Sequence, residues 1–92
     1  MITRIVINHV KEGHKEDYIA VSKAFLAELM ETCGCMEATV YEVEGSNDVA
    51  NIETWPDVET ADAVTKTDTF RKFVPQLVAH FAGNETLVLH KK

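Results

Sequence analysis

The sequence predicts an α+β domain of the ferredoxin-like type, in which helices cover one face of a four-stranded antiparallel sheet. Apolar, β-branched segments alternate with amphipathic helical segments in the order strand, helix, strand, strand, helix, strand. A strong turn signal separates the two middle strands. Two βαβ units split in this βαββαβ order form such a sheet. A chain of 92 residues is the size of one domain, which we place at 1–92.

The first strand and the first helix are predicted at residues 2–11 and 14–32. Ile and Val dominate the strand, and Glu12-Gly13 breaks the pattern before apolar side chains recur at helical spacing. Cys33-Gly34 ends the helix, and Cys35 is expected to enter the core. A disulfide across one intervening residue would be strained, so both thiols are expected to be free. A bound metal would need two further donors, which the sequence does not place nearby.

The middle of the chain is predicted to form a β-hairpin. Residues 36–44 are rich in β-branched and aromatic side chains, as strands usually are. The Gly-Ser-Asn-Asp segment at 45–48 favours a turn. It leads into a third strand at residues 49–55, which ends before Pro56.

The last third is predicted to be a helical region, broken once, and a final strand. Asp57 can cap a first helix, and residues 65–68 offer a second cap. Apolar side chains at helical spacing follow, with Pro75 expected to bend or restart the helix. Residues 82–84 are predicted to end it, which leaves 85–90 for the last strand.

This topology leaves the second face of the sheet without cover. A chain this short buries only about 60–65% of the surface that its unfolded form exposes, so its core is small. Two sheets packed face to face would cover both open faces. We therefore expect a homodimer.

Composition argues against several classes of partner. The chain is 46% hydrophobic and 26% charged, which is typical of a globular domain, and its net charge is -6. An acidic chain without a Lys or Arg cluster is repelled by nucleic acid and by anionic membranes. No apolar run approaches the roughly 20 residues that span a bilayer. The N-terminus lacks the apolar core of a secretory signal, so we expect a cytoplasmic protein without nucleic-acid or membrane partners.

One face of the third strand carries an unusual combination of side chains. Alternation along a strand places Asn51, Glu53 and Trp55 together. Buried polar groups need partners, so this face indicates a solvated surface or the wall of a ligand pocket. Three structural alternatives remain: Trp55 as an apolar plug bonded to a loop, Asn51 facing solvent, and Glu53 as a satisfied or exposed carboxylate.

These residues also carry a resemblance to a known family. Glu53-Thr54-Trp55 resembles the E-x-W signature of the antibiotic biosynthesis monooxygenase-like family. Other similar segments are Ile2–Val6, Lys11–His14, Gly34-Cys35 and Phe70–Phe73. The resemblance implies a dimeric α+β barrel. It also implies oxidation of aromatic quinols or anthrones by dioxygen, with no cofactor, neither metal nor flavin.

The resemblance extends to individual residues. Asn51 and Trp55 match the spacing of the asparagine and tryptophan that line the pocket in quinone-forming members, which implies a catalytic role for both. Asn51 would stabilise a substrate oxyanion, and the Trp55 indole would hold the aromatic plane. Glu53, Tyr41 and Asn8 are further candidates for binding a small aromatic substrate.

The second helical region departs from the family pattern. Many members carry histidines where this chain has Val64 and Thr69. Because the haem-degrading branch uses a histidine of this helix as its axial ligand, the change argues against haem binding. Two classes of function stay open: a monooxygenase, and a non-catalytic dimer that binds a small apolar ligand or acts in a stress response.

Overall fold

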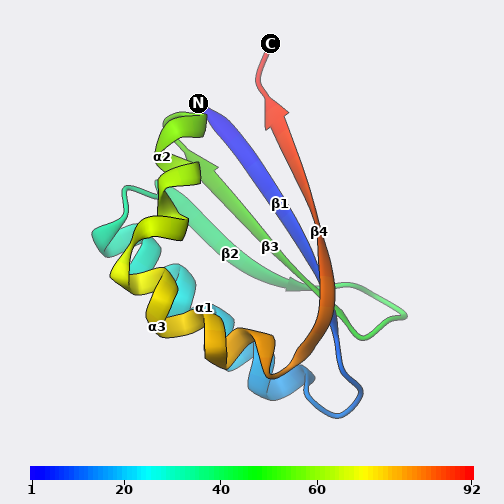
Figure 1. The fold of residues 1–92 in the computed structure, drawn as a ribbon. Coiled ribbons are helices and arrows are strands. Elements are labelled where there is room, and N and C mark those ends of the chain that lie inside the picture. Colours follow the sequence, from blue (N-terminus) through cyan, green and yellow to red (C-terminus); the bar gives the residue numbers. More distant parts are fainter.

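The chain folds into a four-stranded antiparallel sheet with helices on one face (Figure 1). The computed structural model describes residues 1–92. In chain order the elements are β1 (Ile2–Val10), α1 (Lys15–Thr32), β2 (Glu37–Glu42), β3 (Asp48–Trp55), α2 (Val58–Asp62), the 3₁₀ helix η1 (Ala63–Lys66), α3 (Asp68–Val78) and β4 (Phe81–His90). The strands lie in the order β2-β3-β1-β4. The predicted ferredoxin-like α+β fold is confirmed.

The first strand lies in the middle of the sheet, between β3 and β4, and its register aligns polar side chains across three strands. Arg4 lies opposite Glu53 on β3. Two residues further along β1, Val6 lies between Asn51 on β3 and Thr86 on β4. Because alternate side chains share a face, these residues all point toward the helices.

The helical region after β3 breaks once, as the sequence predicts. The carboxylate of Asp57 accepts a hydrogen bond of 2.7 Å from the backbone N–H of Thr60 and caps α2. The hydroxyl oxygen of Thr67 accepts one of 3.2 Å from the N–H of Phe70 and caps α3. None of the helices has the length and apolar character needed to cross a lipid bilayer.

The boundary between α3 and β4 was predicted wrongly. The helix runs through Pro75 without restarting and ends at Val78, and the strand begins at Phe81 rather than at residue 85. Pairing with β1 explains the difference, since Phe81 lies opposite Val10 beyond an irregularity in the register. The backbone N–H of Lys11 also donates to the carbonyl of residue 80 at 2.8 Å. These long-range bonds prevail over the local signals at residues 82–84.

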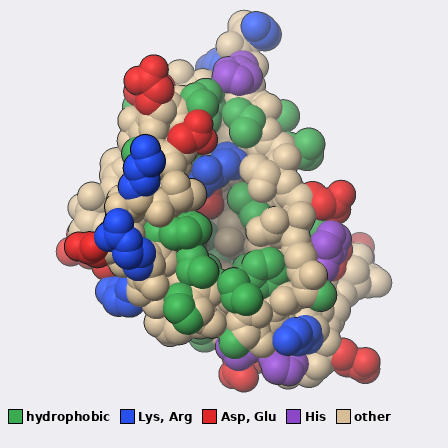
Figure 2. All heavy atoms as spheres, in the orientation of Figure 1, with side chains coloured by type: hydrophobic (Ala, Val, Ile, Leu, Met, Phe, Trp, Pro, Cys, Tyr) green, Lys and Arg blue, Asp and Glu red, His purple; other side chains and the backbone are tan.

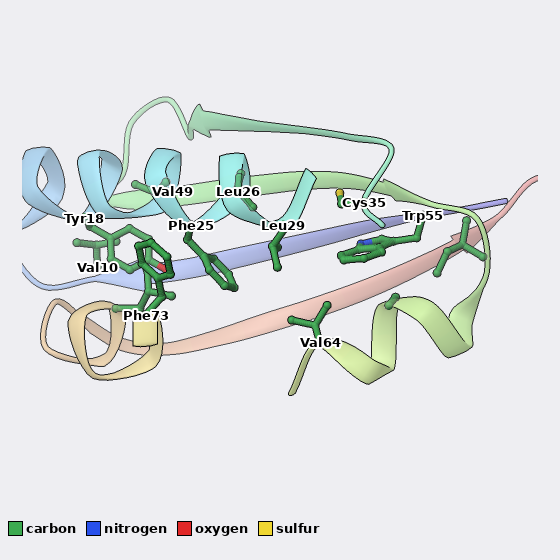
Figure 3. Close-up of a cluster of buried hydrophobic side chains, with 13 residues drawn as sticks. Val10, Tyr18, Phe25, Leu26, Leu29, Cys35, Val49, Trp55, Val64 and Phe73 are labelled. Atoms are coloured by element: carbon green, nitrogen blue, oxygen red, sulfur yellow. The ribbon is translucent and has the colours of Figure 1, made fainter. Parts of the chain in front are cut away.

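The hydrophobic core fills the space between the helices and the sheet (Figure 3). Phe25 from α1 and Phe73 from α3 meet with ring centroids 5.4 Å apart. Cys35 lies beside Trp55 in this core, and both cysteines are free thiols, as predicted. Burial, followed by the charge of Glu53, raises the pKa of Cys35, so its thiol stays protonated.

The opposite face of the sheet carries no helix (Figure 1). Apolar side chains on it are accessible to solvent, and Leu87, Leu89 and Tyr41 are each about half exposed. Within a single chain, nothing covers this open face.

Candidate active site

A cavity of about 280 Å³ lies between the helices and the sheet. Figure 2 shows it as a hollow between the helices and β4, with hydrophobic side chains around it and charged ones toward one end. Its apolar lining comes from Val6, Tyr18, Phe25, Val64, Phe70, Val74, Leu77, Val78 and Phe81. Its polar lining comes from Arg4, Asn8, Asn51, Glu53, Thr65, Asn84 and Thr86. The cavity therefore has an apolar wall, mostly from the helices, and a polar wall, mostly from the sheet.

The polar face of β3 points inward. Asn51, Glu53 and Trp55 are all buried, so Asn51 does not face solvent. Asn51 and Glu53 line the cavity, whereas Trp55 does not. The indole lies in the core behind Glu53 and is fully buried. Its N–H is bonded to Glu53 rather than to a loop.

Glu53 is the centre of a buried hydrogen-bond network. Its Oε1 accepts from Nε of Arg4 at 3.0 Å, from Nη2 of Arg4 at 2.9 Å and from Nε1 of Trp55 at 2.8 Å. The side chains of Arg4 and Glu53 are only 19% and 3% exposed. The guanidinium carbon of Arg4 also lies 5.5 Å from the centroid of the Trp55 ring. Charged groups buried in this way require each other, because either alone would be strongly destabilising.

Two asparagines on the polar wall differ in how their amides are used. Nδ2 of Asn8 donates to the carbonyl of Val49 at 3.1 Å, which fixes that side chain to the sheet. Oδ1 of Asn51 is buried and accepts no hydrogen bond. An unpaired buried acceptor is costly, and because Asn51 lines the cavity, a donor bound there could satisfy it.

Tyr18 contributes a protonated hydroxyl to the apolar wall. Burial raises the pKa of Tyr18 to about 12, so the phenol is neutral at physiological pH. Its ring meets Phe81 edge-on, with centroids 6.0 Å apart. These two rings close one end of the apolar wall.

No histidine lines the cavity. His9 lies at the other side of the sheet, where Nδ1 is 3.0 Å from Asp48 and Nε2 is 3.1 Å from Glu85. His14 and His80 contact each other, with their Nδ1 atoms 3.1 Å apart, where α1 begins and α3 ends. Imidazole groups are therefore not placed to move a proton inside the cavity.

The remaining candidate from the sequence, Tyr41, lies elsewhere. Its side chain is half exposed on the open face of the sheet and does not line the cavity. The register pairs it with Ala50, whose neighbour Asn51 points the opposite way. Alternation along β2 and β3 accounts for this placement.

Sequence reasoning missed Arg4, and it also missed Thr65, Asn84 and Thr86 of the polar wall. The signal for Arg4 was a single charged residue within the apolar run Ile2–Val6, in a strand that proves to be central. Recognising it required the register that sets Arg4 opposite Glu53.

The side chains present offer little to a metal. No group of three or more His, Cys, Asp or Glu residues is arranged so that it could hold a metal ion. Val64 occupies the cavity wall at one of the two positions where the resemblance predicts a histidine. Thr69, at the other, is buried and hydrogen-bonded to Glu28 at 3.2 Å. A haem iron would find no histidine, cysteine or methionine ligand among the residues that line the cavity.

Solved structures with this fold include oxygenases. An antibiotic biosynthesis monooxygenase superposes with a TM-score of 0.86 at 17% identity, over 100% of this chain and 99% of the other. SnoaB, a cofactor-independent oxygenase from Streptomyces nogalater, gives 0.85 at 16% identity, over 99% and 92%. A conserved protein from Methanosarcina mazei Go1 gives 0.84 at 25% identity, over 100% and 94%. At such identities the likeness concerns the fold.

Sequence comparison supplies the family. No curated protein matches the chain significantly. The sequence model of the antibiotic biosynthesis monooxygenase family matches residues 1–76, which include Arg4, Asn8, Asn51 and Glu53 of the polar wall. The chain therefore belongs to the antibiotic biosynthesis monooxygenase family.

Proposed function

We propose that this protein is a cofactor-independent monooxygenase that oxidises a small aromatic quinol or a polyketide-like compound with dioxygen. Family membership supports this reaction class. The cavity supports the substrate class, because its apolar wall suits an aromatic plane and its polar wall suits oxygen substituents along one edge.

The unpaired Oδ1 of Asn51 is the observation that carries the proposal. A phenolic hydroxyl could donate to this oxygen and relieve an unsatisfied acceptor in the free protein. A ligand without a hydrogen-bond donor would leave it unpaired. Asn51 therefore favours a hydroxylated aromatic ligand over an apolar one.

The reaction uses electrons that the substrate already holds. A phenol or anthrone loses a proton and becomes an electron-rich anion, which reduces dioxygen. One oxygen atom becomes the new carbonyl oxygen, and the other leaves as water with the two hydrogens that the substrate loses. The protein binds the substrate, favours its anion and excludes water from the reactive carbon.

Oxygen consumption tests this reaction directly. Purified protein would be mixed with a panel of quinols, naphthols and anthrones in an oxygen electrode, and the products analysed by mass spectrometry under ¹⁸O₂. We expect one ¹⁸O atom in the product, which is a quinone from a naphthol or an anthrone and a hydroxyquinone from a quinol, and a rate well above that of spontaneous oxidation. The proposal would be contradicted if, for every compound of the panel, oxygen were consumed no faster with the protein than in buffer alone.

A second function has one specific observation in its favour. Because no histidine lines the cavity, the proton acceptor that oxygenase chemistry needs is not an imidazole of this chain. A non-catalytic protein that binds a small aromatic molecule would need no such group. Saturable binding of a quinol without oxygen consumption would favour this function.

The proposal includes a homodimer. The open face of the sheet exposes Leu87 and Leu89, and a second copy packed on it would remove these side chains from water. The net charge of -6 favours solubility, but it leaves the apolar side chains of the open face in contact with water.

A further inference from the structure

Arg4 is the one cationic side chain that lines the cavity. Its positive charge favours ligands that carry an ionised oxygen. We propose that Arg4 binds the ionised oxygen of an acidic phenol or enol, and that Glu53 and Trp55 are positioning residues that hold its guanidinium in place. This inference rests on the proposed function, which supplies the aromatic substrate.

Arg4 keeps hydrogen-bond donors available to a ligand. Its bonds to Glu53 use Nε and Nη2, which leaves Nη1 outside this network. The side chain lines the cavity and is 19% exposed, whereas that of Glu53 is 3% exposed. A guanidinium stays protonated at every physiological pH, so these donors always carry positive charge.

Glu53 and Trp55 fix the orientation of this guanidinium. Two bonds to one carboxylate oxygen restrict the rotation of Arg4, and the Trp55 N–H donates to the same oxygen. The indole also lies 5.5 Å from the guanidinium carbon, within the range of a cation–π contact. The E-x-W pair therefore acts on the ligand through Arg4 rather than by contact with the indole.

The charges around the cavity favour an anion at Arg4 alone. The titratable groups that line it are Arg4, Glu53 and Tyr18, and Tyr18 is neutral. Glu53 offsets part of the positive charge, but it offers no donor to an oxyanion. With an apolar wall opposite, screening by water is weak, so a hydrogen bond from Nη1 to an oxyanion is strengthened.

Asn51 supplies the second contact for such a ligand. It lies two residues from Glu53 on the same face of β3, so its amide is about 7 Å further along the strand. A ligand with an ionised oxygen at Arg4 and a hydroxyl at Oδ1 of Asn51 would satisfy both groups. This pattern describes a dihydroxylated aromatic whose oxygens lie at opposite ends of the ring system.

The ionisation state of a bound chromophore tests the role of Arg4 without requiring turnover. The probes are 4-nitro-1-naphthol, whose ionisation is visible by absorbance, and its methyl ether, which cannot ionise. We expect the wild-type protein to bind the naphtholate about tenfold tighter than the ether, and to lower the pKa of the bound naphthol by about one unit. We expect Arg4→Met to abolish both effects, and Arg71→Met, at the exposed arginine of α3, to change neither.

Further variants keep the test valid if Arg4→Met does not fold. Arg4→Gln combined with Glu53→Gln retains a polar pair without a buried lone charge, and we expect it to bind the ether while losing the preference for the naphtholate. We expect Trp55→Phe to reduce that preference about threefold while leaving ether binding unchanged, because the indole does not line the cavity and acts on the ligand only through Glu53 and Arg4. A preference that survives in the double variant would overturn the inference.

The outcomes for this inference and for the proposed function are separable. A naphtholate preference that depends on Arg4, together with no oxygen uptake by any quinol, would reject the monooxygenase and support the role of Arg4. Oxygen uptake with an unchanged pKa of the bound naphthol would support the monooxygenase and reject the role of Arg4.

Discussion

Nε1 of Trp55 donates a hydrogen bond of 2.8 Å to Oε1 of Glu53, two residues earlier on the same face of β3. In Trp55→Phe this bond is lost and the carboxylate keeps only its bonds from Arg4. We expect the lost bond to lower the free energy of unfolding by about 1–3 kcal/mol, because a buried charged acceptor loses a donor, and the void left by the smaller ring to lower it further. Urea denaturation followed by circular dichroism measures this, since the variant has no tryptophan.

Tyr41→Phe is the matched control for that substitution. It also removes one polar atom from an aromatic side chain, but the hydroxyl lies on a half-exposed residue of the open face. We expect the free energy of unfolding of Tyr41→Phe to stay within about 0.5 kcal/mol of the wild-type value. Equal losses in the two variants would show that the bond to Glu53 contributes nothing specific.

Asn51→Leu is expected to change stability and ligand binding in opposite directions. The substitution removes a buried acceptor that has no partner and replaces it with an apolar side chain of similar size, so the free energy of unfolding is expected to rise. Affinity for a hydroxylated aromatic is expected to fall about tenfold, since one hydrogen bond to the ligand is lost. Thermal unfolding and a binding titration on the same preparation measure both effects.

Asn8→Leu provides the comparison for Asn51→Leu. The amide of Asn8 donates to the carbonyl of Val49, so its removal leaves that buried carbonyl short of a partner. We expect this variant to be less stable than the wild type. If both leucine variants lost stability to the same extent, Oδ1 of Asn51 would not be the unsatisfied group that the structure indicates.

Leu87→Glu tests the proposed homodimer. This side chain is 54% exposed on the open face, where a second copy is proposed to pack. A carboxylate buried in an apolar interface is strongly unfavourable, so we expect a dimeric mass for the wild type in light scattering and a monomeric mass for the variant. Val58→Glu, on the exposed side of α2, serves as the control and should leave the mass unchanged. A monomeric wild type at micromolar concentration would contradict the dimer.

His9 makes stability depend on pH. Its hydrogen bond with Asp48 raises the pKa of His9 in the folded state, so folding favours the protonated imidazole. The stabilisation is complete below the ordinary value of about 6.5 and is lost as the pH rises through the folded pKa. We expect the stability difference between wild type and His9→Asn to shrink between pH 6 and pH 8. A difference that stays constant between pH 6 and pH 8 would contradict this dependence.

The sequence predicted that Asn51, Glu53 and Trp55 share one face of β3, because side chains alternate along a strand, but it left open whether that face meets solvent or a pocket. The structure buries all three side chains. The sequence could not predict the partner of Glu53, because register across a sheet depends on pairing between segments far apart in the chain. Arg4 is 49 residues from Glu53, and no local pattern joins them. The candidate site was thus predictable along one strand and unpredictable across strands.

The end of α3 illustrates the same limit. Apolar spacing continues through Phe81, so the helical pattern predicted from sequence extends past the true end at Val78. In the fold, Phe81 instead pairs with Val10, and Tyr18 packs against its ring. Tertiary contacts decide the backbone of a segment whose composition suits either conformation.

The central position of β1 sets the order in which the protein can be completed during synthesis. The strand that leaves the ribosome first gains one neighbour when β3 emerges, but its other edge stays unpaired until Phe81–His90 has been made. That last strand also carries Asn84 and Thr86 of the cavity wall. A nascent chain that ends before it presents an open edge to other chains, and we expect it to aggregate rather than to bind ligand.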